Sequence, residues 1–141
     1  MRNKSYETIC AVIDTNALVS ALVGSGSPRK LVLKLLENHL VVLSPEMLAE
    51  LADVLSREKF KDIRSSQVDR FIAGLIHKAK IVRVRSRFKA IAADPNDDIV
   101  LNTAYSGKAR YIVTGDNHLL ALKAFKGIEI VKVAKMLELI K

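Results

Sequence analysis

The chain has 141 residues, 50% of them apolar, and its 23 Lys and Arg against 15 Asp and Glu give a formal net charge of +8. This length suits one domain over residues 1–141 that buries its own core, and the single Cys10 excludes a framework of intramolecular disulfides. Because the sequence has neither a run of about 20 apolar residues nor an apolar leader, we expect a cytoplasmic protein with no membrane segment. The positive charge favours contact with nucleic acid or another polyanion without showing it.

The first half of the chain alternates short apolar runs with helical periodicity. Strands are predicted at residues 9–13 and 40–43, and helices at 17–23, 29–38, 45–56 and 66–79. Ser44 followed by Pro45 is a helix-start signal, with the hydroxyl as cap and the proline at the first helical position. The short apolar runs are typical of strands that are buried on both faces.

The second half begins with an alternating segment at residues 81–88, which predicts an edge strand with Arg83, Arg85 and Arg87 on its outer side. A turn at residues 94–98 then opens a helix that runs to about residue 105, and Gly107 occupies its C-cap position. The remaining elements are predicted as a strand at 111–113, a helix after Asp116, a strand at 128–131 and a helix at 133–140.

Strands that alternate with helices in this way form βαβ units. We therefore expect an α/β fold, a three-layer α/β/α sandwich with a central, mainly parallel twisted sheet. In such sheets the functional site lies at the carboxyl ends of the strands.

Acidic residues occur at or near this edge of the predicted sheet. Asp14 and Asp116 directly follow predicted buried strands, whereas Glu50 and Asp98 lie near the starts of helices. Each also has a structural interpretation, because an aspartate in these positions caps a helix or complements its dipole. Glu50 shares a helix face with other acids and can equally be a solvated side chain.

The acids are better explained together than one by one. Carboxylates that meet at one edge repel each other and raise each other's pKa unless a cation offsets their charge. All-oxygen ligands favour Mg²⁺ or Mn²⁺ over zinc, which prefers His or Cys ligands at close spacing. The pattern therefore indicates a divalent metal site.

At this point the residues resemble a known family, the PIN domain, a family of metal-dependent ribonucleases. The resemblance rests on the segments 13–16, 44–50, 94–101 and 113–120, which appear in the family's order and span nearly the whole chain. The form is similar to the compact, stand-alone branch that is associated with the toxin components of toxin–antitoxin pairs.

The resemblance implies roles for particular residues. Asp14, Glu50, Asp98 and Asp116 would be the catalytic acids, and Asp14, Asp98 and Asp116 the metal ligands; Asn16 and Thr114 would be polar supports, and Asp97 is the main ambiguity. The spacing to Asp116 and the apolar residues that follow favour Asp98 over Asp97.

The implied activity is metal-assisted hydrolysis of phosphodiester bonds in single-stranded or structured RNA, with Mg²⁺ or Mn²⁺ as cofactor. Arg83, Arg85 and Arg87 are candidates for RNA binding, and the alternative for them is a charged edge strand that deters aggregation. An antitoxin partner and a homodimer or higher homo-oligomer follow by analogy with the family. The competing hypothesis is a non-catalytic module that keeps the fold and binds nucleic acid or protein.

Overall fold

A computed structural model describes residues 7–89 and 94–141 of the chain. Its strands are β1 (Cys10–Ile13), β2 (Leu40–Leu43), β3 (Lys80–Ile81), β4 (Tyr111–Val113), β5 (Ala124–Phe125) and β6 (Ile128–Val131). Its helices are α1 (Thr15–Val23), α2 (Ser27–Asn38), α3 (Pro45–Leu55), the short 3₁₀ helix η1 (Glu58–Phe60), α4 (Ser65–Lys78), α5 (Pro95–Ser106), α6 (Asn117–Leu122) and α7 (Val133–Leu139). None of the helices in this described part of the chain combines the length and the hydrophobicity needed to cross a bilayer.

The described strands form one six-stranded sheet in the order β3-β2-β1-β4-β6-β5. All neighbouring pairs are parallel except β5 and β6, which are antiparallel. The register pairs Ile13 with Val113 and Val113 with Val131. The carboxyl ends of β1, β4 and β6 therefore lie level at one edge of the sheet, which is where the site was predicted.

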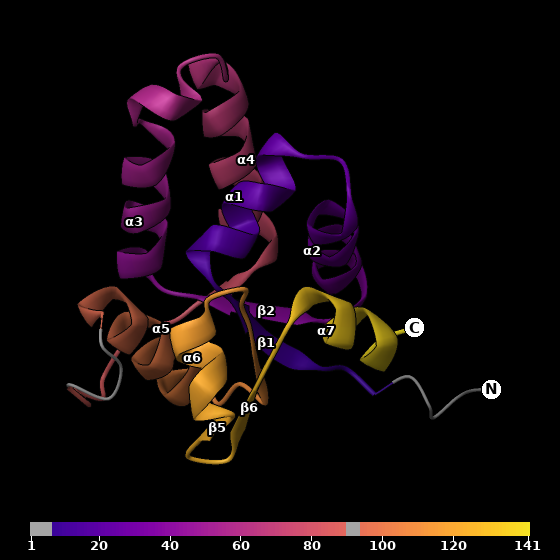
Figure 1. The fold of residues 1–141 in the computed structure, drawn as a ribbon, viewed down its shortest axis with the longest axis vertical. Coiled ribbons are helices and arrows are strands. Elements are labelled where there is room, and N and C mark those ends of the chain that lie inside the picture. Colours follow the sequence, from indigo (N-terminus) through magenta and orange to yellow (C-terminus); the bar gives the residue numbers. More distant parts are fainter. Residues whose placement is uncertain (1–6, 90–93) are drawn as a thin grey trace.

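Helices cover both faces of this sheet. Helices α5 and α6 lie on one side, and α1, α2 and α7 lie on the other, while α3 and α4 rise together beyond the sheet edge (Figure 1). Helix α5 packs against β1, β2 and β4, and α2 packs against both α1 and α7. The predicted α/β fold with a mainly parallel sheet is confirmed.

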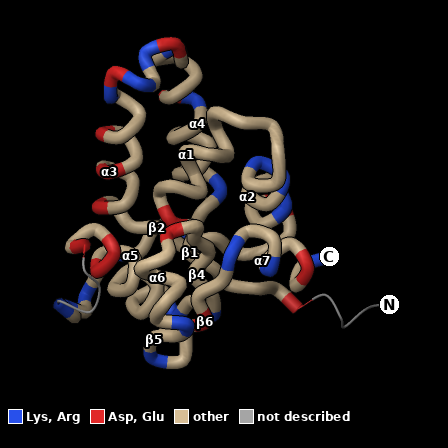
Figure 2. The backbone as a smooth tube through the Cα atoms, in the orientation of Figure 1, with Lys and Arg blue, Asp and Glu red and all other residues tan. Residues whose placement is uncertain are grey.

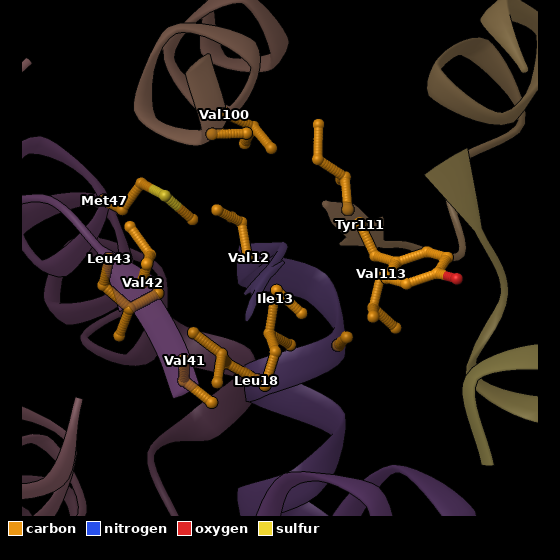
Figure 3. Packing of buried hydrophobic residues seen from close by; sticks show 14 of the residues in the cluster. Val12, Ile13, Leu18, Val41, Val42, Leu43, Met47, Val100, Tyr111 and Val113 are labelled. Atoms are coloured by element: carbon orange, nitrogen blue, oxygen red, sulfur yellow. The ribbon is translucent and has the colours of Figure 1, made fainter. Parts of the chain in front are cut away.

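The core lies between the sheet and these helices. Val12, Val42 and Ile112, from the three central strands, have no exposed surface. Figure 3 shows Val12 and Val42 meeting Met47 of α3 and Val100 of α5 in one continuous apolar cluster. Burial of apolar area on this scale is the dominant stabilising contribution to a fold, and it holds the strand ends in fixed positions.

Local structure departs from the sequence-based prediction in three places, the first of which is the short helix η1, in a segment where no element was predicted. The predicted edge strand at 81–88 ends at Ile81, and residues 82–89 belong to no helix or strand. Strand β5 was not predicted, because its two residues give no usable periodicity. Elsewhere the predicted and observed elements agree to within about two residues, the usual uncertainty of helix ends.

Candidate active site

Asp14 directly follows β1 and is held there by hydrogen bonds of its backbone and its side chain. Its backbone N–H donates to the Val113 carbonyl (2.9 Å), while its Oδ1 accepts from the Asn16 N–H (2.9 Å) and caps α1. Its Oδ2 accepts from the Thr114 hydroxyl. The side chain is buried, at 5% exposure, and this burial raises the pKa of Asp14, an effect that the two hydrogen bonds oppose and the charge of Asp116 reinforces.

Thr114 connects Asp14 to the next acid. Its buried hydroxyl also accepts from the backbone N–H of Asp116 at 3.0 Å. Asp116 caps α6 by accepting from the His118 N–H at 2.7 Å, and its side chain is 24% exposed. Thr114 therefore holds the carboxylate of Asp14 and the backbone of Asp116 next to each other.

Glu50 reaches the site from α3. Its Oε1 accepts from the hydroxyl of Thr15 at 3.2 Å, and Thr15 is the residue that follows Asp14. Burial raises the pKa of Glu50, an effect that the bond from Thr15 opposes and the charges of Asp14 and Asp94 reinforce. Glu50 is thus half-buried and hydrogen-bonded, which distinguishes it from the solvated acids on its helix.

The start of α3 is tied to α5 below the site. Ser44 caps α3 by accepting from the Met47 N–H at 3.3 Å, and its hydroxyl lies 2.8 Å from that of Thr103 in α5. Both hydroxyls are fully buried. This contact fixes the two helices that carry Glu50 and the acids of residues 94–98 relative to each other.

Of the two adjacent aspartates in α5, Asp97 is the one that faces the other acids. It is 7% exposed and lies one helical turn before Val100 and Leu101, which are buried on the same face. Burial, together with the charges of Asp116, Asp14 and Asp94, raises the pKa of Asp97 to about 6. Its Oδ2 is buried and has no hydrogen-bond partner among the described residues.

Asp98 lies elsewhere on the same turn. It is half-buried, and its backbone carbonyl accepts from the side-chain amide of Asn102 at 2.8 Å. It does not line the cavity into which the other acids open. The structure therefore brings Asp97, rather than the Asp98 that sequence spacing favoured, together with Asp14 and Asp116.

These acids line a cavity of about 550 Å³ between α1, α3 and the start of α5. Its uncharged polar and acidic lining consists of Asp14, Thr15, Asn16, Ser20, Glu50, Asp94, Asn96, Asp97 and Asp116, and its cationic and aromatic lining of Arg57, Lys59 and Phe60. In Figure 2 the acidic positions of α3 and of the start of α5 lie on the same side of the molecule. The cavity is therefore an acidic site with a basic rim.

The donor chemistry of this site fits a divalent cation. Carboxylate oxygens are the ligands that Mg²⁺ and Mn²⁺ prefer, and the unpartnered Oδ2 of Asp97 is a buried oxygen whose desolvation an ion would offset. Across residues 7–89 and 94–141, however, no three His, Cys, Asp or Glu side chains are arranged so that they could hold an ion as they stand. The acids therefore line one cavity without forming a complete ligand set among the described residues.

Two residues of the cavity lining, Thr15 and Asp94, were not predicted as site residues, whereas the basic residues Arg57 and Lys59 belong to a segment whose charge had made it a second candidate for substrate binding. Thr15 and Asp94 lie within the segments 13–16 and 94–101 that carry the family resemblance, and this position was the signal that could have identified them. Arg83, Arg85 and Arg87 are exposed and do not line the cavity.

Comparison with known proteins relates this chain to a protein family. A sequence profile of the PIN domain matches residues 10–118, which contain all the acids described above. The chain matches no curated protein. Among solved structures, a chain of VapBC2 from Rickettsia felis, crystallised bound to a DNA fragment from their promoter, is similar with a TM-score of 0.64 and 20% identity over 88% of this chain and 98% of that one.

A second solved structure, PAE2754 from Pyrobaculum aerophilum, is similar with a TM-score of 0.63 and 17% identity, over 93% of this chain and 89% of that one. At these identities the two structures support the fold. The profile match covers most of the chain and includes the strand ends that carry the acids. The chain belongs to the PIN domain family.

Proposed function

We propose that this protein is a divalent-metal-dependent endoribonuclease whose active site is the acidic cavity formed by Asp14, Glu50, Asp97 and Asp116. PIN domains are generally nucleases, which supports hydrolysis of a phosphodiester bond. The observation that carries the proposal is the convergence of Asp14, Asp97 and Asp116, with the pKa of both Asp14 and Asp97 raised. Perturbed pKa values cluster at functional sites, which supports a functional role for these acids.

Each residue has a defined part in the proposed mechanism. Asp14, Asp97 and Asp116 would hold Mg²⁺ or Mn²⁺, which when bound lowers the pKa of water and offsets charge on the phosphate. Thr114 and the Asn16 N–H hold the Asp14 carboxylate in place. Glu50, held by Thr15, would accept a proton from the attacking water, a role suited to a carboxylate whose pKa burial raises.

The basic rim supports a phosphate-containing substrate. Arg57 and Lys59 line the same cavity as the acids, and the Lys59 ammonium lies 5.1 Å from the centre of the Phe60 ring. Cations at the mouth attract the nucleic-acid backbone, whereas the carboxylates inside would repel it without a bound metal. This arrangement favours catalysis over the competing hypothesis of a purely binding module.

The predicted partners remain proposals. The fold similarity to VapBC2, a toxin–antitoxin protein, supports an antitoxin partner for this chain and a role as the toxin of such a pair. Homo-oligomerisation also remains a prediction, and the molar mass of the purified protein in solution tests it.

The test of the catalytic proposal is cleavage of a 5′-labelled single-stranded RNA with Mn²⁺ or Mg²⁺. We expect Asp14→Asn and Glu50→Gln to lower the cleavage rate by more than the roughly 10- to 100-fold that loss of a supporting outer-shell group costs. Asp69→Asn removes an equal charge from the exposed surface of α4 and serves as the matched control with unchanged rate.

Thermal unfolding of each variant separates loss of catalysis from loss of fold, and Glu50 is the safer position because it is half-buried. Undiminished cleavage by folded Asp14→Asn would contradict the proposal. If the wild-type protein bound RNA but cleaved none of it with either metal, the non-catalytic module would be the better description.

A further inference from the structure

Residues 82–89, called the strap below, leave the edge strand β3 and run along the outside of α5. Exposure alternates at every position, the two-residue period of an extended chain. The more buried residues are Val82, Val84, Ser86 and Phe88, and the exposed ones are Arg83, Arg85, Arg87 and Lys89. The strap therefore presents a single row of cations to solvent.

Asn102 of α5 holds the strap in this conformation. Its side chain is buried, at 6% exposure, and its Oδ1 accepts from the Phe88 N–H at 2.9 Å and from the Ser86 hydroxyl at 2.7 Å. Its Nδ2 donates to the carbonyl of Phe88 at 2.8 Å. One amide thus satisfies both backbone groups of Phe88, as a neighbouring strand would.

Further contacts fix the register of the strap. The hydroxyl of Ser106 accepts from the Arg85 N–H at 3.1 Å. The ring of Phe88 packs edge-to-face against Tyr105 and Phe125, with centroids 5.0 Å and 5.3 Å apart. These contacts over residues 85–88 hold the arginine side of the strap outward.

Edge protection does not explain this row of cations. The backbone bond from Val82 to Leu43 is the last one that joins this segment to the sheet. The arginines that follow do not cover an exposed strand edge, because the backbone N–H groups of Arg85 and Phe88 donate to side chains of α5 instead of to a strand. Within the described part of the chain none of these four cations forms an ion pair, so no neighbouring carboxylate offsets their charge.

An aromatic side chain lies beside the row. Tyr105 is 45% exposed, and its ring contacts the strap through Phe88. Proteins that bind single strands combine a cationic track for the backbone with aromatic side chains on which bases stack. The strap and Tyr105 place both elements on one surface.

The row also runs toward the acidic cavity. Arg85 is bonded to the last residue of α5 and Phe88 to Asn102, so the strap runs antiparallel to that helix. The N-cap residue of α5, Asp94, and Asp97 in its first turn both line the cavity. Figure 2 shows basic positions of the strap near the acidic start of α5.

We propose that Arg83, Arg85, Arg87 and Lys89 form a track for the phosphates of a single-stranded RNA, with Tyr105 as a stacking platform and Asn102 as a positioning residue. Alternate residues of an extended chain recur about every 6.6 Å, a pitch comparable with the spacing of successive phosphates in an extended strand. The proposal rests on the proposed nuclease function, because it defines how that site selects a single strand.

The test is binding of a fluorescent single-stranded RNA measured by anisotropy at several salt concentrations. Asp14→Asn is introduced in every sample to prevent cleavage. We expect the triple variant R83Q/R85Q/R87Q to bind at least 10-fold more weakly, with the slope of log affinity against log salt reduced by about 2 from the loss of three phosphate contacts. K30Q/K132Q/K135Q removes the same charge from exposed positions of α2, α7 and the residue before α7, and should bind normally.

Two single variants test the other residues. Tyr105→Leu keeps an apolar side chain but removes the ring, and should weaken single-strand binding about 5-fold or more. Asn102→Ala keeps every cation, so its binding to duplex RNA should persist while its preference for single strands is lost. A loss of fold would instead reduce both.

Equal affinities of the strap variant and the lysine control would overturn the proposal. So would a wild-type affinity for duplex RNA equal to that for the single strand, which would identify a general polyanion patch. Parallel cleavage assays without the Asp14 substitution keep the two proposals distinguishable. If the wild-type protein cleaves no RNA but R83Q/R85Q/R87Q still weakens RNA binding, only the nuclease proposal is refuted. If R83Q/R85Q/R87Q binds and cleaves RNA as well as the wild-type protein does, only the track proposal is refuted.

Discussion

At the scale of single residues, Asp97 and Asp98 show how one position changes the composition of a site. Adjacent helical residues point in directions about 100° apart, so two neighbouring carboxylates cannot enter one cavity equally. Asp97 shares its face with Val100 and Leu101 and is buried with them, whereas Asp98 is half-buried off this cavity. The position of the apolar residues therefore decides which acid joins Asp14.

This arrangement predicts unequal effects of two otherwise identical substitutions. Asp97→Asn should lower the rate of RNA cleavage at saturating metal at least about 10-fold more than Asp98→Asn, because it removes a ligand oxygen from the cavity rather than an acid outside its lining. The two rates are compared on one labelled RNA, with thermal unfolding as the check on folding. A larger loss with Asp98→Asn would place Asp98 in the site instead.

At the scale of elements, α5 connects the site to the core and to the strap. Its first turn carries Asp97, its middle holds Thr103 against Ser44 and Asn102 against the strap, and Gly107 caps its end. The glycine is required by packing rather than by its backbone angles, since its φ is −87°. A Cβ atom there would lie 2.4 Å from Cγ1 of Val42 in the central sheet.

Gly107→Ala should therefore destabilise the protein. The added methyl group overlaps a fully buried side chain, and overpacking of this kind costs about 1–3 kcal/mol, which lowers the melting temperature by several degrees. Gly74→Ala is the matched control, because nothing lies within 4 Å of its added Cβ and α4 gains a better helix former. Equal stability of Gly107→Ala and wild type, measured by chemical denaturation, would contradict the packing assignment.

At the scale of the whole molecule, a chain of net charge +8 concentrates acids in one cavity. Burial and mutual repulsion raise the pKa of Asp14, Glu50 and Asp97. These groups therefore reduce the free energy of unfolding when they are ionised and metal is absent. The remaining structure has to offset this cost at neutral pH.

The metal-free protein should accordingly lose stability as pH rises from about 4 to 7. The pKa of Asp97 is about 6 in the folded state against 3.8 for the ordinary side chain, so between these values the folded state binds more protons than the unfolded state. Its contribution to this loss is about 1–3 kcal/mol. Urea denaturation in EDTA at several pH values measures this loss of stability, and Asp97→Asn should make the free energy of unfolding depend less on pH.

Added Mn²⁺ provides the complementary measurement. An ion that binds the ionised carboxylates of the folded state raises the melting temperature, and this gain should be larger at pH 7.5 than at pH 5, where protons compete for the same oxygens. A pH-independent effect of Mn²⁺, or the same pH dependence in Asp97→Asn as in wild type, would show that Asp97 is not the group responsible.

The sequence by itself determined the features that depend on local chemistry. Apolar periodicity and helix caps located nearly every element, and the strand ends placed Asp14 and Asp116 at one edge, because side-chain period and capping involve residues close in the chain. The parallel order of the strands followed from the alternation of strands with helices.

Tertiary structure decided what depends on residues far apart in the chain. It selected Asp97 over Asp98, paired Thr15 with Glu50, brought Arg57 and Lys59 to the rim and attached the strap to α5 instead of the sheet. Sequence pattern indicates which face of an element is apolar, but not which partner that face will meet. That choice is made by packing and by the need to satisfy buried polar groups, and both are properties of the assembled fold.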